Sequence, residues 1–127
     1  MTSYISDRLG VQPGDSLLLQ NAPRGYLGTL WPVPDDVTVT GDVSQGPFDI
    51  VQTFIRDPVG AEATLNDALD VANTCRVFWV TIQQDSNGAP AGVPVQQIKR
   101  TLEAAGWEER ASFKIDIHWL AMRFDAE

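Results

Sequence analysis

The sequence predicts an α/β fold in which a mostly parallel β-sheet lies between two layers of helices. Segments 16–20 and 76–82 are apolar almost without interruption, which is typical of strands buried on both faces of a parallel sheet. Segments with apolar residues at helical spacing alternate with the strand segments. Segment 111–124 alternates apolar and polar side chains, which indicates a closing hairpin that adds one antiparallel strand.

The first half of the chain predicts a turn of helix, a buried strand, a short helix and a second strand. The expected bounds are 4–9, 16–20, 25–31 and 37–40. Gly10 is placed to end the first helix. The crossover between the strands is short because Pro32 and Pro34 stop its helix.

The second half predicts a strand, a helix, a strand, a helix and the hairpin. The expected bounds are 48–55, 58–73, 76–82, 94–105 and, for the hairpin strands, 111–117 and 120–124. Asp57 and Pro58 suit the N-cap and first turn of the first helix, and Gly106 suits the end of the second. We therefore expect a single domain over residues 1–127.

Composition and charge exclude several classes of function. The net charge is −8 with only nine Lys and Arg, which argues against nucleic-acid binding because phosphate contacts need clustered cations. No apolar stretch approaches the roughly 20 residues that cross a membrane, and the start of the chain lacks the pattern of a secretory signal. We expect an acidic, cytoplasmic protein.

The residues that carry chemistry are few. His118 and Cys75 are the only histidine and cysteine, so they cannot build a zinc site and no metal is expected. We expect Cys75 to be a small, buried hydrophobic residue. We expect the four tryptophans to occupy core or sheet-covering positions. No Ser-His-Asp arrangement, P-loop or pair of carboxylates stands out, so no catalytic residue is assigned.

The order of elements resembles a known fold family. The run "FDIVQTFI", helix, "RVFWVTI", helix and hairpin looks like the back half of the class I, Rossmann-like methyltransferases. This resemblance implies the strand order 2-1-3-4-6-5.

A closer resemblance covers almost the whole chain. It is to a bacterial domain-of-unknown-function family of short, methyltransferase-like proteins. The matching residues are Leu9-Gly10, Pro13-Gly14, Asn21-Ala22-Pro23, Gly25-Tyr26, Pro34 with Val37, Phe48-Asp49, Trp79-Val80 and Asp116 with Trp119. The chain departs from the family after Trp79-Val80, where the family has Trp-Pro-Lys and this segment reads Thr81-Ile82-Gln83-Gln84. The resemblance implies the fold and no particular activity.

The loop after the first strand is the expected ligand edge, because open α/β sheets bind ligands where the strand order reverses. In the implied order this crevice lies between segments 20–23 and 55–57. Nucleotide cofactors and methyl donors need a glycine-rich turn here, but the loop reads Asn-Ala-Pro-Arg-Gly. The sequence therefore argues against standard cofactor binding, and no cofactor is expected.

Eight residues are candidates for ligand contact: Asn21, Pro23, Arg24, Tyr26, Asp42, Arg56, Asp116 and His118. All of them except Arg24 and Arg56 also have a structural alternative. Asn21 can bond its own backbone, Pro23 can open a helix, and Tyr26 can pack on the sheet edge and close the crevice.

Three of the candidates, Asp42, Asp116 and His118, lie further from the loop. Asp42 could bond a ribose hydroxyl or belong to the turn after its strand. Asp116 could line the ligand edge or, with Trp119, fix the hairpin turn. His118 could be a general base or a solvated turn residue.

Two functions fit these observations. The first is a non-catalytic binding or interaction module, with a homodimer or another protein as its partner. The second is a small enzyme or ligand-binding protein that uses the crevice for an anionic or nucleotide-like ligand, with Arg24 and Arg56 receiving the anion. The missing glycine motif favours the first.

Overall fold

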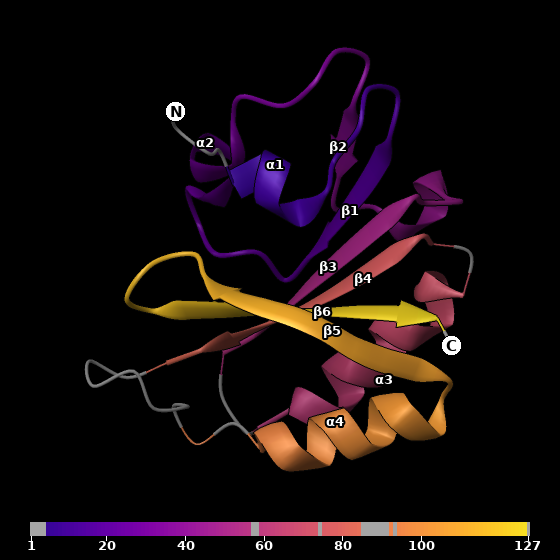
Figure 1. Ribbon diagram of the computed structural model, residues 1–127, viewed down its shortest axis with the longest axis vertical. Helices are drawn as coiled ribbons and strands as arrows, with labels where there is room; N and C mark the ends of the chain where they lie inside the picture. Colours follow the sequence, from indigo (N-terminus) through magenta and orange to yellow (C-terminus); the bar gives the residue numbers. More distant parts are fainter. Residues whose placement is uncertain (1–4, 57–58, 74, 85–91, 93, 127) are drawn as a thin grey trace.

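The computed structural model describes residues 5–56, 59–73, 75–84, 92 and 94–126 (Figure 1). The helices are α1 (Ile5–Leu9), α2 (Tyr26–Leu30), the 3₁₀ turn η1 (Val43–Gln45), α3 (Ala61–Ala72) and α4 (Val95–Ala104). The strands are β1 (Ser16–Gln20), β2 (Thr38–Thr40), β3 (Ile50–Ile55), β4 (Val77–Gln83), β5 (Trp107–Lys114) and β6 (Trp119–Ala126).

The six strands form one sheet in the order β2-β1-β3-β4-β6-β5, so the predicted strand order is confirmed. The neighbours β2, β1, β3 and β4 pair in parallel. Strand β6 is antiparallel to both β4 and β5, which makes it the single antiparallel strand. The order reverses between β1 and β3, and the carboxyl ends of these strands therefore define the ligand edge.

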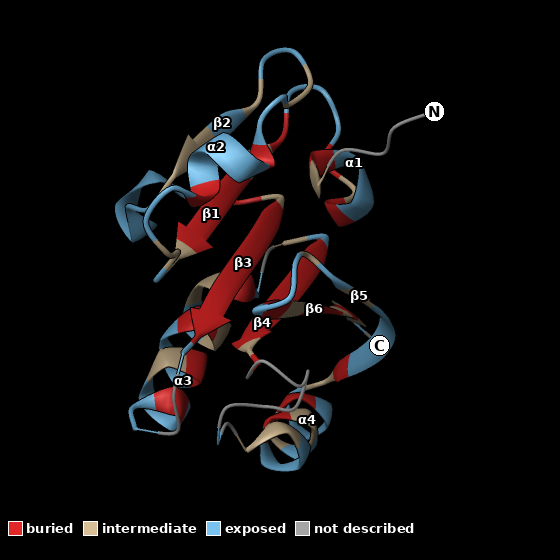
Figure 2. Ribbon diagram, turned by 90° about the vertical axis from the view of Figure 1, so that its left-hand side faces the viewer, coloured by how far each residue is buried: buried red, intermediate tan, exposed pale blue. Residues whose placement is uncertain are grey.

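Helices cover both faces of the sheet (Figure 1). Because side chains alternate along a strand, Leu18 and Val51 face the cluster that includes α3 and α4. Leu17 and Ile50 face the opposite cluster, which includes α1 and α2. Strands β1, β3 and β4 are buried along most of their length (Figure 2). The prediction of central strands covered on both faces is confirmed.

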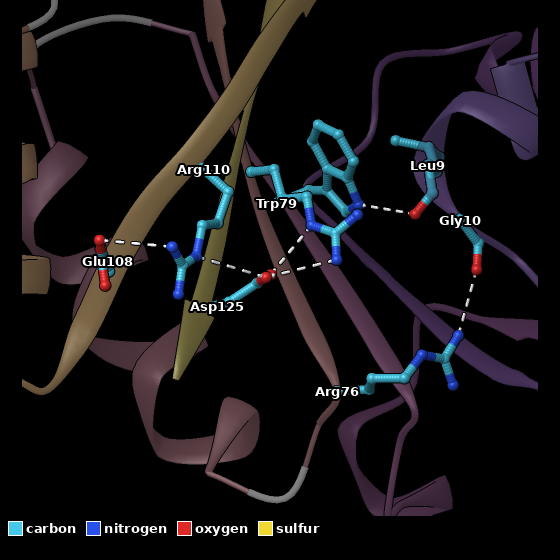
Figure 3. A network of polar contacts seen from close by, with 8 residues as sticks. Leu9, Gly10, Arg76, Trp79, Glu108, Arg110 and Asp125 are labelled. Carbon is cyan, nitrogen blue, oxygen red and sulfur yellow. Dashed lines mark hydrogen bonds and ion pairs between the residues drawn. The ribbon is translucent and has the colours of Figure 1, made fainter. Parts of the chain in front are cut away.

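At the amino edge of the sheet, polar contacts tie the N-terminal segment to β4. Arg76 forms an ion pair with Asp15, with 2.7 Å between Nη2 and Oδ2. The same guanidinium donates to the carbonyl of Gly10, and the Trp79 indole donates to the carbonyl of Leu9 (Figure 3). These contacts hold α1 against the sheet, far from the carboxyl edge.

Several element bounds differ from the prediction. Helix α3 begins at Ala61 with Gly60 at its N-cap in a left-handed conformation (φ 80°); the predicted start at Asp57-Pro58 lies outside the described residues. Strand β5 begins at Trp107, earlier than predicted, and contains a bulge between Glu109 and Ala111. Trp31 is 56% exposed, so its predicted core or sheet-covering position is wrong, whereas the other tryptophans are buried. No helix in the described ranges could cross a membrane.

Candidate functional site

The loop at the carboxyl end of β1 is fastened to β3 by side chains. Asn21 has a positive φ of 62°, which asparagine tolerates better than most residues. Its amide Nδ2 donates to the carbonyl of Phe54, at 2.9 Å. The predicted hydrogen-bonding role of Asn21 thus exists, but its partner is the neighbouring strand and not its own backbone.

Arg56 fixes the same loop from the other side of the strand-order reversal. Its Nη2 donates to the carbonyls of Asn21 and Ala22, at 3.1 and 2.9 Å. The side chain therefore satisfies backbone acceptors of the loop.

Tyr26 begins α2 and is buried under the loop, with 5% of its surface exposed. Its ring packs edge-on against Phe54 with 4.7 Å between centroids. The hydroxyl donates to Gln52 Oε1 at 3.0 Å, and Gln52 Nε2 donates to Thr81 Oγ1 at 3.0 Å. Burial, with a smaller contribution from the charge of Asp116, raises the pKa of Tyr26 above its usual value.

Gly25, and not Pro23, forms the N-cap of α2, with φ at 86°. The prediction that Pro23 opens this helix is wrong. Pro23 lies in the preceding turn, where its carbonyl accepts a hydrogen bond from the amide of Tyr26.

One cavity at this edge lies between the loop and the end of β2, and we call it the edge pocket. Its volume is about 480 Å³. It is lined by Leu19, Asn21, Ala22, Pro23, Gly25, Tyr26, Leu27, Val39, Thr40 and Gly41. Tyr26 forms part of its wall and leaves it open.

The predicted crevice between β1 and β3 is a smaller hollow. It has a volume of about 200 Å³ and is lined by Asn21, Ile55, Arg56, Val59, Ala61 and Thr64. The larger space lies on the β2 side of β1, because Arg56 spans the reversal point and binds the loop there.

A third cavity, the hairpin pocket, lies between the loop and the turn that joins β5 to β6. Its volume is about 140 Å³, and it is lined by Pro23, Arg24, Gly25, Tyr26, Thr29, Ile115, Asp116 and Trp119. Arg24 and Asp116, far apart in sequence, therefore share one cavity. Asp116 Oδ1 also accepts the backbone amides of His118 and Trp119, as the turn-fixing alternative predicts.

Two predicted site residues do not line these cavities. His118 is exposed at the hairpin turn, in agreement with the alternative of a solvated residue. The Asp42 carboxylate accepts hydrogen bonds from the hydroxyl and amide of Ser44, which lower the pKa of Asp42 and cap η1. Among the described residues, no three His, Cys, Asp or Glu side chains are grouped so that they could hold a metal ion.

Sequence reasoning missed Gln52 and the apolar walls of the edge pocket. Gln52 is fully buried in β3 and connects Tyr26 to Thr81. The available signal was a glutamine inside a strand that is apolar apart from Gln52 and Thr53, since a buried amide needs partners. Leu27, which is 52% exposed beside the pocket, gave no comparable signal.

Comparison with known proteins identifies the fold. No family model and no curated protein matches the sequence. Magnesium protoporphyrin IX methyltransferase from Synechocystis PCC 6803, with bound SAH, matches with a TM-score of 0.60 at 11% identity, over 91% of this chain and 75% of that one. The ribosomal protein L11 methylase of Lactobacillus delbrueckii subsp. bulgaricus matches with a TM-score of 0.57, also at 11% identity, over 95% of this chain and 74% of that one.

A third solved structure agrees. A putative tRNA (m1A22) methyltransferase from Streptococcus pneumoniae matches with a TM-score of 0.56 at 10% identity, over 99% of this chain and 71% of that one. At such identities the likeness shows the fold alone. The chain has the methyltransferase-like Rossmann fold that the sequence resemblance implied.

Proposed function

We propose that this chain is a non-catalytic binding domain with a methyltransferase-like fold, and that the edge pocket holds a nucleoside-type small molecule. The observation that carries this proposal is the cavity of about 480 Å³ at the carboxyl ends of β1 and β2. Its volume is within the range of about 300–1,000 Å³ that small-molecule sites occupy. Its position is at the edge where open α/β sheets take ligands.

The walls of the edge pocket suit an uncharged, flat ligand. Leu19, Leu27 and Val39 provide apolar surface, and Asn21 and Thr40 provide polar groups. None of the described residues that line the pocket is charged. The neighbours from Synechocystis and Streptococcus were solved with SAH and with S-adenosyl-L-methionine, respectively. The adenosine part of these molecules matches the chemistry of the pocket.

The engagement of the polar groups at this edge supports a non-catalytic role. The Tyr26 hydroxyl is held by Gln52, and Arg56 binds two loop carbonyls. Asp42 caps η1. Each of these three groups thus has a structural partner, and Pro23 removes an amide where a cofactor loop offers a donor.

The alternative of one anion held by Arg24 and Arg56 has less support. Arg24 lines the hairpin pocket, whereas Arg56 lines the hollow between β1 and β3. The two guanidinium groups therefore belong to separate cavities. The homodimer, a protein partner and the cytoplasmic location stay predictions.

A thermal-shift titration tests the binding proposal. Adenosine, S-adenosylhomocysteine and S-adenosylmethionine should each raise the melting temperature through binding to the folded state. Leu27→Glu removes apolar wall and adds a charge at the edge pocket, so it should abolish the shift. Val43→Glu is the matched control, because Val43 is 53% exposed and lies outside the pocket lining.

A flat response to all three compounds at millimolar concentration would refute the binding proposal, as would an equal shift in the Leu27→Glu variant. The non-catalytic part has its own test. Incubation with S-adenosylmethionine carrying a labelled methyl group and a cell extract should label no acceptor in a protein-dependent manner. Protein-dependent labelling would overturn the non-catalytic role and leave the binding site intact.

A further inference from the structure

The hairpin pocket brings opposite charges to one small cavity without pairing them. Arg24 and Asp116 both line it. Within the described part of the chain, no ion pair joins the two residues, and neither has another ion-pair partner. The side chains of Tyr26 and Trp119, both at least nine-tenths buried, form the inner wall.

The carboxylate of Asp116 is oriented by the turn that it caps. Oδ1 accepts the amides of His118 and Trp119 at 2.7 and 3.0 Å. Among the described residues, Oδ2 has no hydrogen-bond donor. The charge of Asp116 also acts on the Tyr26 hydroxyl and contributes to its raised pKa, so the carboxylate lies close to the inner wall. It is fixed in place and retains acceptor capacity.

Arg24 supplies the opposite charge. It follows Pro23 in the loop, is exposed, and has no hydrogen-bond partner among the residues that the structure describes. Its guanidinium can therefore donate two parallel hydrogen bonds to a ligand carboxylate without breaking a contact of the fold.

We propose that the hairpin pocket binds a free α-amino acid or a similarly small zwitterion, with the ligand carboxylate on Arg24 and its ammonium group on Asp116. The cavity of about 140 Å³ limits the ligand to a small side chain. A ligand with one charge would leave the other protein charge unpaired, whereas a zwitterion satisfies both. This proposal does not depend on a ligand in the edge pocket, although Pro23, Gly25 and Tyr26 line both cavities.

Nuclear magnetic resonance titration of the ¹⁵N-labelled protein gives a local readout. Glycine, alanine and valine should shift the Trp119 indole and the Gly25 amide signals in a saturable manner at millimolar concentration. Acetate and ethylammonium each carry one of the two charges and should bind roughly tenfold more weakly, because each loses one charge-assisted contact. Leucine and phenylalanine test the size limit and should bind more weakly than alanine.

Three variants locate the site. Arg24→Gln removes the cation, and Asp116→Asn removes the anion but keeps an oxygen that can cap the turn. Each should weaken glycine and alanine binding by roughly tenfold, the loss expected for one charge-assisted contact. Arg110→Gln is the control, because Arg110 is an exposed arginine on β5 outside the pocket lining, and it should bind as the parent protein does.

The proposal is overturned if the amino acids cause no saturable shift at tens of millimolar. It is also overturned if acetate or ethylammonium binds as well as glycine, or if either pocket variant binds normally. The dispersion of each variant's spectrum shows whether it is folded, so a lost fold is distinguished from a lost site. Adenosine binding to the edge pocket would be unaffected by either result.

Discussion

Replacing Tyr26 by phenylalanine should destabilise the protein, because it removes the hydroxyl group that pairs with a buried side chain. The substitution keeps the ring against Phe54 and removes only the hydroxyl, which donates to Gln52 Oε1 at 3.0 Å. Because Gln52 is fully buried, no solvent can replace this donor. A buried acceptor left unpaired costs about 1–3 kcal/mol, and we expect the free energy of unfolding to fall by about 2 kcal/mol.

The assay is equilibrium unfolding in urea, followed by tryptophan fluorescence and far-ultraviolet circular dichroism. A double-mutant cycle with Gln52→Met isolates the pair, because the double variant has neither the donor nor the orphaned acceptor. We expect the two single losses to exceed the loss in the double variant by about 1 kcal/mol, as coupled neighbours do. Thr101→Val is the control, since it removes a side-chain hydrogen bond to Gln97 at an exposed site and should cost less than about 0.5 kcal/mol.

The reasoning fails if Tyr26→Phe costs no more than Thr101→Val. It also fails if the cycle is additive, because Tyr26 and Gln52 would then act independently. Either result would mean that the buried chain from Tyr26 to Thr81 does not hold α2 on the sheet.

Two substitutions test the pKa shifts of Asp15 and Cys75. Burial alone would raise the pKa of Asp15, but hydrogen bonds from Arg76 and from the amide of Gln12 outweigh burial and lower the pKa. The ionised Asp15 carboxylate therefore stabilises the fold above its unfolded pKa, and this stabilisation is lost as the pH falls below about 4. Asp15→Asn should lower the free energy of unfolding by about 1 kcal/mol at neutral pH, a modest value because Arg76 is partly exposed. The variant should also lose less stability than the parent protein as the pH falls below about 4. An unchanged dependence of stability on acid pH would contradict this. Burial raises the pKa of Cys75 from 9.0 to about 11, so the unfolded chain releases this proton first and stability should fall between about pH 9 and 11. Cys75→Ala should reduce that fall in urea unfolding at alkaline pH, and an identical alkaline fall in the variant would rule the thiol out.

Much of the fold could be predicted because its signals are local. The apolar run that became β1 has its predicted bounds, Ser16–Gln20, and the strand order followed from the family resemblance. Strand β5 was predicted to start too late because its exposed edge residues from Glu108 to Arg110 carry no alternating apolar pattern. The exposure of Trp31 also had no local signal, since burial depends on what the rest of the chain places nearby.

The site was predictable in position and less so in shape. The loop after β1 does lie at the ligand edge, as the strand order requires. The contacts that shape its cavities join residues 26 to 35 positions apart, such as Tyr26 with Gln52 and Arg56 with Asn21. Such pairs depend on the register of β1 against β3, which a single sequence does not encode locally.

Several polar groups of the loop from Asn21 to Tyr26 form hydrogen bonds within the fold, although Arg24 stays exposed. In a glycine-rich cofactor loop, backbone amides remain free to meet the ligand. Here the side-chain amide of Asn21 donates a hydrogen bond to β3, and the carbonyls of Asn21 and Ala22 accept hydrogen bonds from Arg56. The backbone amide of Tyr26 donates to the carbonyl of Pro23. These groups are therefore satisfied without a ligand, and the cavities on the two sides of the loop exist before binding. Recognition is left to the apolar walls of the edge pocket and to the two separated charges of the hairpin pocket.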